Sequence, residues 1–259
     1  SNKLIEEFML LANKKVAEKM RKGKERFVYR VHDQPDQEKL KNLQTVVKRM
    51  GYNLKLTSKE LNDSLNSLLK NAFGKNEQNL IDTLMIRSMS KAEYTTKNIG
   101  HYGLSFENYT HFTSPIRRYP DVMVHRLMQA EIEGEKIKTE ETESLCKHST
   151  HMEILATKAE RDSIKLMQIK FMKDKEGKTF DAVISGVIAR GIFVEVVENK
   201  CEGLVKAKDL PGDFFVHDQK NHRFVGERTG KKFQLGDKTR VMLIKADQIK
   251  KRLDFQVLT

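Results

Sequence analysis

Cysteine is scarce in this 259-residue chain, which contains only Cys146 and Cys201, far apart and with no Cys-x-x-Cys pair. Two isolated cysteines exclude a disulfide framework and a cysteine-based zinc site, and they predict a reducing, cytoplasmic setting. No stretch approaches the roughly 18 consecutive apolar residues of a membrane-spanning helix. The first residues also lack an apolar signal-peptide core, so membrane and secretory classes are excluded and we expect a soluble protein.

Acidic residues are outnumbered by basic ones. The chain has 36 Asp and Glu against 48 Lys and Arg, a formal net charge of +12, and a pI near 9.5. Such a surface attracts polyanions, and nucleic acid is the first partner class that it indicates. The chain begins with Ser-Asn rather than Met, so we expect its start to have been processed, trimmed or cloned.

Most of the chain carries helical patterns. A wide apolar stripe over 3–21 predicts a helix that is buried on at least one side. Further elements are expected as a short strand at 27–31 and helices over 35–50, 58–73, 77–91, 121–133 and 139–173. Gly51 is the expected C-terminal stop of the helix before it.

The apolar pattern changes from helical to alternating beyond a polar joint at 173–178. Five β-rich runs follow, at 180–188, 192–197, 203–206, 238–246 and 253–258. Five strands within this length are typical of an OB-fold barrel, which presents one face to single strands. The predicted fold class is therefore α+β, with a largely helical domain over 1–175 and a five-stranded OB-fold barrel over 176–259.

The stretch from 97 to 121 fits neither pattern, because it mixes glycines, prolines, aromatics and hydroxyls. Such a loop indicates a site. Two prolines restrict its second half, and Asp121 is expected to be the N-cap of the helix that follows. Arg117 and Arg118 are then held in place, and a held arginine is a candidate phosphate clamp. The alternative is that one arginine pairs with a structural carboxylate while the other is solvated.

The same stretch carries a long motif. It reads His-Tyr-Gly-Leu at 101–104, then Tyr-x-His-Phe-Thr-Ser-Pro-Ile-Arg-Arg-Tyr-Pro-Asp-x-x-x-His-Arg at 109–126. This closely resembles the late motif of the ribonuclease II and ribonuclease R family of exoribonucleases. Leu-Ile-Glu-Glu-Phe-Met-Leu-Leu-Ala-Asn at 4–13, Arg-Val-His-Asp at 30–33 and Ala-Glu-Arg-Asp at 159–162 also look like that family's catalytic domain. The tail resembles its S1-type RNA-binding barrel, and the detail is closer to ribonuclease R than to ribonuclease II.

By this resemblance the intact enzyme hydrolyses single-stranded RNA processively from the 3′ end to nucleoside 5′-monophosphates, with Mg²⁺ held by clustered aspartates. In the family that cluster precedes the Ile-Glu-Glu helix with which this chain begins, and no Asp-x-Asp occurs here. Asp33 and Asp36 flank a helix start rather than converge on a metal. Since two-metal hydrolysis needs several carboxylates, we expect no metal ligand in this chain. It should bind RNA but be inactive alone, as the C-terminal part of a larger enzyme.

Three residues receive catalytic roles from the resemblance. Arg117 matches the arginine that contacts phosphates near the scissile bond, a role that suits a rigid guanidinium. Glu6 and Glu160 match acidic residues beside the terminal nucleotides, where Glu6 is expected to accept from a ribose hydroxyl. The resemblance favours Glu6 over Glu7. The residues alone leave open that Glu6 and Glu160 only pair with helix-borne cations such as Arg161.

Six residues are expected to contact RNA. They are Arg118, Tyr119 and His111 in the loop and Arg190, Phe193 and Lys206 in the barrel. Phe193 lies in a strand motif where exposed aromatics stack on bases, but the sequence leaves open whether it faces RNA or the core. Arg190 and Lys206 stand where relatives often have an aromatic, glycine or histidine, which favours tighter and more salt-sensitive binding. A long insertion with Phe214, Phe215, His217 and His222 is a further candidate for the RNA path.

A histidine metal site is not expected. His32, His101, His111 and His125 come from separate elements without close ligand spacing, and Mg²⁺ prefers oxygen ligands. We expect these histidines to be structural or to face RNA.

The leading hypothesis is a part of an RNA-degrading enzyme whose partner is single-stranded RNA. The second is a non-catalytic RNA-binding protein that keeps the same scaffold, which the missing aspartates favour. A DNA-binding protein would need a groove-reading helix that the sequence does not offer. No protein partner is evident, but an incomplete domain exposes edges and core, which leaves self-association open.

Overall fold

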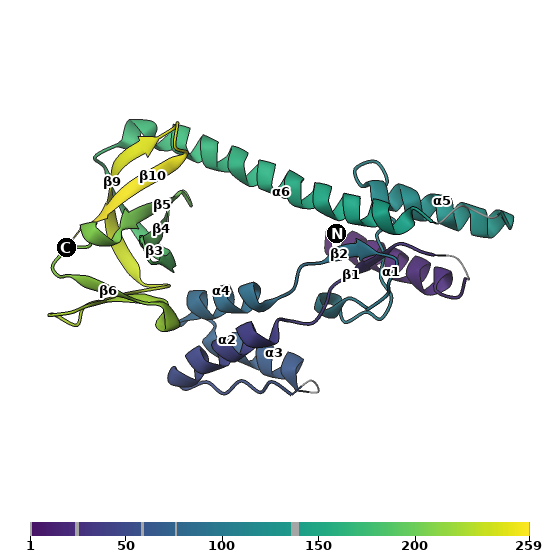
Figure 1. Cartoon of the computed structure of the whole chain (residues 1–259), viewed down its shortest axis with the longest axis horizontal. Helices are drawn as coiled ribbons and strands as arrows, with labels where there is room; N and C mark the ends of the chain where they lie inside the picture. The colour runs from purple at the N-terminus through teal and green to yellow at the C-terminus, as the bar shows by residue number, and fades with distance from the viewer. Residues whose placement is uncertain (1, 24–25, 58–59, 76, 136–139, 259) are drawn as a thin grey trace. The chain divides into compact units, whose positions relative to one another are not determined.

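The structure is a computed structural model that describes residues 2–23, 26–57, 60–75, 77–135 and 140–258 (Figure 1). Packing divides it into two compact units. The first comprises the residues up to Asp36 together with Met89–Lys158, and the second comprises Gln37–Ser88 with Ala159–Thr259. This division falls inside one long helix, whereas the predicted boundary at 175/176 marks the change from a helical to an alternating pattern.

The first unit holds the N-terminal helix, a two-stranded sheet and the central loop. Its elements are α1 (Asn2–Met20), β1 (Tyr29–Val31), β2 (Glu93–Thr95), the 3₁₀ turn η1 (Tyr102–Leu104), α5 (Tyr119–Glu133) and the first half of α6 (Thr142–Met172). β1 and β2 pair antiparallel, with Arg30 opposite Tyr94. The core of this unit joins the C-terminal half of α1 to β1 and α5 through Val16, Ala17, Val28, Val124 and Leu127.

The apolar stripe of α1 is buried only in its second half. Val16, Ala17 and Met20 are buried, whereas Leu4, Ile5, Phe8, Met9 and Leu11 are each at least 45% exposed. The prediction of a helix buried along one side is therefore correct only for the last turns, because the described chain packs nothing against the first ones.

The second unit begins with three helices, α2 (Gln37–Arg49), α3 (Leu61–Ala72) and α4 (Gln78–Ser88). Their buried faces carry leucines and isoleucines three and four residues apart, including Leu40, Leu43, Leu65, Leu80 and Ile81. Gly51 takes φ +87° just after α2, as expected of a residue that ends a helix.

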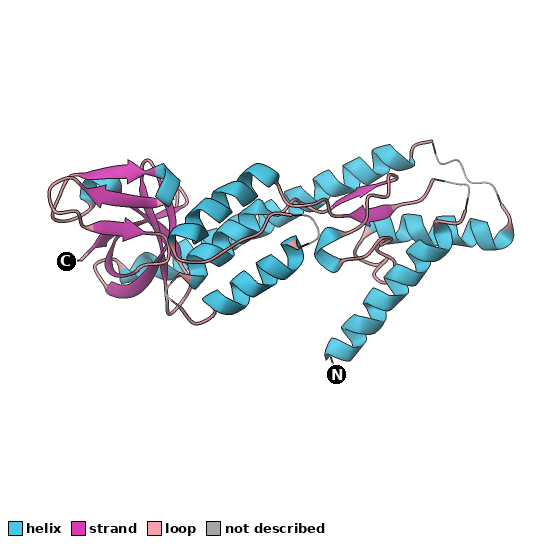
Figure 2. Ribbon diagram, turned by 90° about the horizontal axis from the view of Figure 1, so that it is seen from below, coloured by secondary structure: helices cyan, strands magenta, loops and turns pink. Residues whose placement is uncertain are grey.

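The barrel of the second unit confirms the five predicted strands. They are β3 (Thr179–Ile188), β4 (Gly191–Val196), β5 (Glu202–Lys206), β9 (Lys238–Asp247) and β10 (Arg252–Val257), closed in the order β10-β5-β4-β3-β9. Alternate residues such as Ile184, Ile192, Val194, Leu243 and Leu253 fill the interior. Figure 2 shows that most of the strands of the described chain gather with the C-terminus, while the earlier part is mainly helical.

A second, three-stranded sheet interrupts the barrel between β5 and β9. It consists of β6 (Phe215–Asp218), β7 (Arg223–Gly226) and β8 (Lys232–Gln234), all antiparallel. The residues alone identify this segment only as a long insertion, since strands of three or four residues are too short to show a period. Short 3₁₀ turns complete the unit at η2 (Lys173–Lys175), η3 (Ala207–Asp209) and η4 (Gln219–Asn221).

Across the described ranges, the helices are all too short or too polar to cross a membrane.

Candidate functional site

The loop between β2 and α5 has an irregular backbone that buried polar groups hold in place. Asn13 of α1 accepts a hydrogen bond from the Phe112 amide at 3.0 Å and donates its side-chain amide to the Tyr109 hydroxyl at 3.2 Å. Thr110 is fully buried and donates its hydroxyl to the carbonyl of Val28, just before β1, at 2.7 Å. Because α1 and β1 both bond to this segment, its conformation is fixed by the core of the first unit.

Asp121 holds the last turn of the loop in place through hydrogen bonds. The carboxylate is 0% exposed, and its Oδ1 accepts from the Ser114 amide at 2.7 Å and from Nη2 of Arg118 at 2.8 Å. The prediction that Asp121 is the N-cap is wrong, because α5 begins at Tyr119 and Arg118 occupies the N-cap position. Pro120 explains the earlier start, since proline fits the first turn of a helix, where its missing N–H needs no partner.

The two arginines of the loop point to different environments. The Arg118 side chain is 19% exposed and forms an ion pair with Asp121. Arg117 is exposed, and among the residues that the structure describes its guanidinium meets no carboxylate within ion-pair distance. The alternative raised from sequence therefore holds for Arg118, while Arg117 is the cation that remains available to a ligand. Tyr119 beside them is 47% exposed.

His111 and His101 are half-buried in this loop and are uncharged at neutral pH. Burial, with help from nearby arginines, lowers the pKa of His111 to about 3, and burial also lowers the pKa of His101 to about 4. Nδ1 of His111 lies 2.7 Å from the Tyr94 hydroxyl. The predicted RNA contact of His111 stays a prediction, and its observed contact is with Tyr94. Within the described ranges, no three His, Cys, Asp or Glu side chains are grouped so that they could hold a metal ion.

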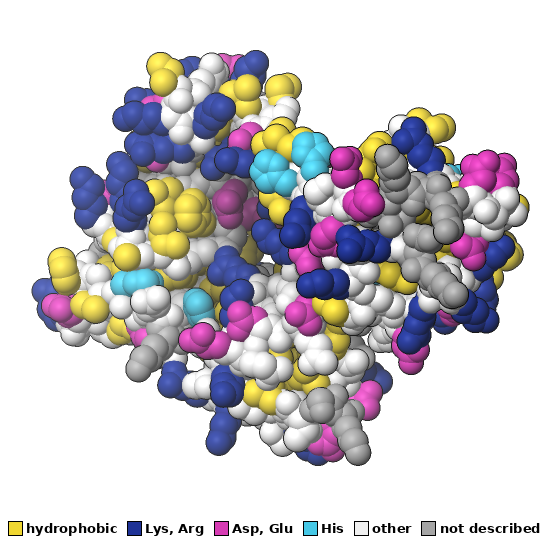
Figure 3. Space-filling model, turned by 45° about the vertical axis from the view of Figure 1, so that its right-hand side comes forward, with side chains coloured by type: hydrophobic (Ala, Val, Ile, Leu, Met, Phe, Trp, Pro, Cys, Tyr) yellow, Lys and Arg dark blue, Asp and Glu magenta, His cyan; other side chains and the backbone are white. Residues whose placement is uncertain are grey.

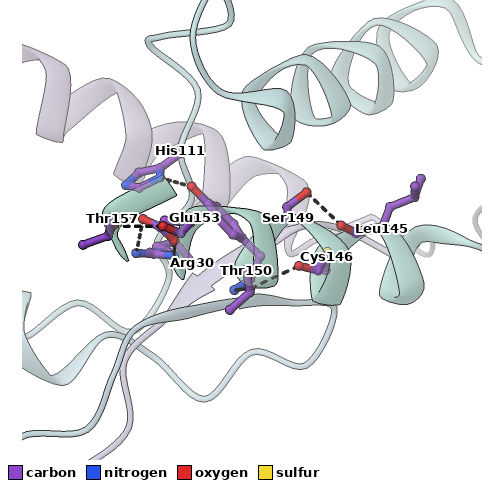
Figure 4. Close-up of polar contacts among 9 residues, drawn as sticks. Arg30, His111, Leu145, Cys146, Ser149, Thr150, Glu153 and Thr157 are labelled. Carbon is purple, nitrogen blue, oxygen red and sulfur yellow. Dashed lines mark hydrogen bonds and ion pairs between the residues drawn. The ribbon is translucent and has the colours of Figure 1, made fainter. Parts of the chain in front are cut away.

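An ion pair that joins distant parts of the chain braces this region. The guanidinium of Arg30 donates to both carboxylate oxygens of Glu153 on α6, at 2.7 and 3.0 Å, and stacks 4.5 Å from the centre of the Tyr94 ring. Thr150, one turn earlier on α6, accepts from the Tyr94 amide at 2.9 Å. Figure 4 shows these α6 residues beside Arg30 and His111. Sequence reasoning missed this brace, because nothing local links residues 123 positions apart.

The predicted catalytic glutamates are solvent-exposed. Glu6 and Glu7 both lie on the first half of α1 and both are exposed, so burial does not distinguish between them. Glu160 is exposed on α6. Their roles stay predictions from the family resemblance.

Of the three barrel residues predicted to contact RNA, Phe193 lies on β4, Lys206 ends β5, and Arg190 directly precedes β4. Ile192 and Val194 are fully buried, so Phe193 between them faces outward, where it pairs with Leu204 across the two strands. Lys206 is two residues from Leu204 and therefore on the same outer face. The question left open for Phe193 is settled in favour of the outer face.

Gly191 allows β4 and β5 to approach closely at this face. Its φ is +152°, and a Cβ there would lie 2.0 Å from the carbonyl oxygen of Val205. Arg190, directly before it, is exposed and accepts at its carbonyl from the Ala207 amide at 2.9 Å. The outer face of β4 and β5 thus carries the Phe193 ring and the Lys206 cation, and the exposed Arg190 directly precedes β4.

Basic side chains are not confined to these sites. Figure 3 shows Lys and Arg spread over one face of the molecule, with acidic side chains between them. The net positive charge therefore indicates a polyanionic partner but does not locate the binding sites, which have to be identified from local geometry.

The fold and these sites define an α+β protein with a pinned arginine loop and an OB-fold barrel. The RNB-domain family model matches residues 1–134, and the S1 RNA binding domain model matches residues 173–258. The chain belongs to the RNB-domain family and carries an S1 domain, which confirms the family resemblance found in the sequence.

Named relatives agree with this assignment. Ribonuclease R of Aquifex aeolicus is 40% identical over 262 residues, an alignment that covers 100% of this chain and 37% of the relative. Mycoplasma genitalium RNase R, solved in complex with ribose methylated single-stranded RNA, superposes with a TM-score of 0.87 at 30% identity. That superposition covers 98% of this chain and 41% of the other. Yeast Ssd1, described as a pseudonuclease, gives a TM-score of 0.68 at 25% identity over 85% of this chain and 28% of its own. The chain thus spans about a third of the length of the curated relatives that it matches.

Proposed function

We propose that this chain is part of a processive 3′→5′ exoribonuclease that hydrolyses single-stranded RNA to nucleoside 5′-monophosphates. The observation that carries the proposal is the exposed Arg117 at the tip of a loop whose other polar groups are pinned, within a motif of the RNB family. The held backbone fixes where the Arg117 side chain leaves the loop, and a planar guanidinium can form two parallel hydrogen bonds to one phosphate.

The barrel is proposed to make a second contact with the same RNA. Phe193 offers a ring on which a base can stack, a contact of about 1–3 kcal/mol per base. Lys206 and Arg190 attract the adjacent phosphates. Arg117 binds a phosphate near the scissile bond and stabilises the negative charge that develops there. Glu6 accepts from a ribose hydroxyl, a contact by which RNA is distinguished from DNA, and Glu160 lies near the 3′ end.

The family resemblance implies Mg²⁺ ions, but the described residues do not fit them. No three suitable side chains gather in the ranges that the structure covers, and the Asp33 carboxylate accepts from the amide of the next residue at 2.7 Å. The proposal is therefore that this chain binds RNA and does not cut it alone. A cytoplasmic location is proposed as well, in line with the two buried free thiols.

A non-catalytic RNA-binding protein is the second candidate. The structural similarity to yeast Ssd1 favours it, because Ssd1 shares this scaffold and is described as a pseudonuclease. Metal-binding aspartates encoded upstream in the same gene would count against this candidate.

A time course with 5′-labelled single-stranded RNA and Mg²⁺ tests the proposal, using this chain at a verified intact mass. Binding without shortening is expected. Progressive shortening from the 3′ end would show that carboxylates within this chain hold the metal. The prediction that the chain is inactive alone would then be wrong. Absence of binding at low salt would overturn the RNA-binding function itself.

A further inference from the structure

The second unit contains a groove that the proposed function does not use. It has a volume of about 720 Å³ and lies between the turn that joins α3 to α4 and the strands β8 and β9. Its cationic lining residues are Lys75, Lys231, Lys232, Lys238 and Arg240, and its acidic lining residue is Asp237. Another cavity, of about 660 Å³ beside Lys206, has a more balanced charge, since its lining contains three lysines and two aspartates.

Four of these cations are available to a ligand. Lys231, Lys232, Lys238 and Arg240 are all exposed, and none of them forms an ion pair with a carboxylate in the part of the chain that the structure describes. Lys75 differs, because its ammonium group donates to the Tyr52 hydroxyl at 3.1 Å. The groove therefore carries a local excess of uncompensated positive charge.

The strands fix the spacing of this charge. Lys238 and Arg240 are two residues apart on β9, so their side chains lie on the same side of the strand. Two carboxylates are near. The Asp237 carboxylate accepts a hydrogen bond from the Gln234 amide at 2.8 Å, so it already has a partner within its own turn. Asp181 stands opposite Arg240 in the pairing of β3 with β9, at more than ion-pair distance.

The lining indicates which part of a polyanion the groove recognises. Phe233, its aromatic residue, is only 6% exposed and has the Lys231 ammonium 5.2 Å from its ring centre, so it offers no free face for base stacking. Small-molecule pockets are mostly apolar, whereas this lining is dominated by cations and by polar side chains such as Asn79. The N-terminus of α4 at Gln78 adds the positive end of a helix dipole.

We propose that this groove binds the phosphate backbone of single-stranded RNA without reading its bases, as a contact separate from the outer face of β4 and β5. The inference rests on the proposed RNA-binding function for the identity of the polyanion. It goes beyond that function in placing a second RNA path on strands that the stacking face does not include.

The test compares two charge-matched variants by the fluorescence anisotropy of a labelled oligouridine at several salt concentrations. The groove variant combines Lys231→Gln, Lys232→Gln, Lys238→Gln and Arg240→Gln. The control variant replaces four exposed lysines elsewhere by Gln, namely Lys41, Lys48, Lys165 and Lys250. Each phosphate contact on a single strand contributes about 0.7 to the slope of log affinity against log salt. The groove variant is therefore expected to lose up to about 3 units of slope, and the control variant less than about 1.

A charge-preserving variant guards against misfolding. Replacement of Lys231, Lys232 and Lys238 by Arg should keep both the affinity and the slope, because a groove that reads only charge accepts either cation. In the wild-type chain, bound oligouridine should slow the acetylation of these three lysines more than that of Lys41.

The possible outcomes are distinct. If the wild-type chain fails to bind oligouridine, the proposed function falls and the groove inference with it. If the wild type binds but the groove and control variants have the same slope, only the groove inference is wrong. Displacement of oligouridine by a polyglutamate peptide as effective as unlabelled oligouridine would overturn RNA as the ligand in favour of an acidic protein.

Discussion

Replacement of Asp121 by Ala should loosen the loop that presents Arg117. The substitution removes two hydrogen bonds to a fully buried carboxylate, from the Ser114 amide at 2.7 Å and from Arg118 at 2.8 Å. Hydrogen bonds to a charged group contribute about 1.5–3 kcal/mol each, and breaking a buried ion pair costs about 3–5 kcal/mol. Because the Arg118 side chain is still 19% exposed, water will partly solvate it, and we expect a loss of about 3 kcal/mol in the free energy of unfolding.

Urea unfolding followed by circular dichroism measures this loss, and hydrogen exchange at the Ser114 amide reports on the loop itself. Asp121→Asn keeps an acceptor but not the charge, and should cost about 1–2 kcal/mol. Asp162→Ala serves as the control, because it removes an exposed carboxylate on α6 and should change the stability by less than about 0.5 kcal/mol. An Asp121→Ala chain within about 1 kcal/mol of the wild type, with the Ser114 amide still protected, would refute the bracing role.

Three further predictions concern the two sites and the inserted sheet. Arg117→Ala should lower the salt slope of RNA binding by about 0.7, and Arg117→Lys should restore it; an unchanged slope for Arg117→Ala would remove this residue from the RNA path. Gly191→Ala should destabilise the barrel by about 3 kcal/mol or more in urea unfolding, because its Cβ would lie 2.0 Å from a carbonyl oxygen; a stable variant would contradict the close approach of β4 and β5. Hydrogen bonds from Thr229 and two further amides lower the pKa of Asp213 from 3.8 to about 2. Its stabilising contribution is therefore complete above the unfolded pKa and lost as the pH falls toward 2. Melting curves of wild type and Asp213→Asn should differ at pH 6 and converge near pH 2, and equal curves at pH 6 would contradict this.

Local patterns predicted the secondary structure well where elements are long. The five barrel strands and the helices of the second unit follow from apolar periods that their own residues carry, and Gly51 ends its helix as expected. The prediction missed β6, β7 and β8, whose three or four residues are too few to show alternation. It also overestimated the burial of α1, because periodicity identifies an apolar face but not whether anything covers it.

In the candidate site, too, the sequence predicted the local features but not the contacts between segments. The motif at 109–126 marked the loop and its two arginines, since the residue types are local. Which arginine is free depends on Asp121. This residue lies inside the first turn of α5 and pairs with Arg118, which occupies the N-cap position that the sequence had assigned to Asp121. Phe193 was assigned to a strand by sequence, but only the closed barrel decided that it faces outward.

The sequence by itself determined the α+β class, the barrel, the basic character and the family, because composition, period and motif are properties of contiguous residues. Tertiary structure alone decided the features that join distant segments. These are the Arg30–Glu153 brace, with partners 123 positions apart, and the groove that brings Asn79 near Lys238 and Arg240. The physical reason is that such contacts depend on how elements pack, and residues far apart in the chain carry no shared period from which that packing can be read.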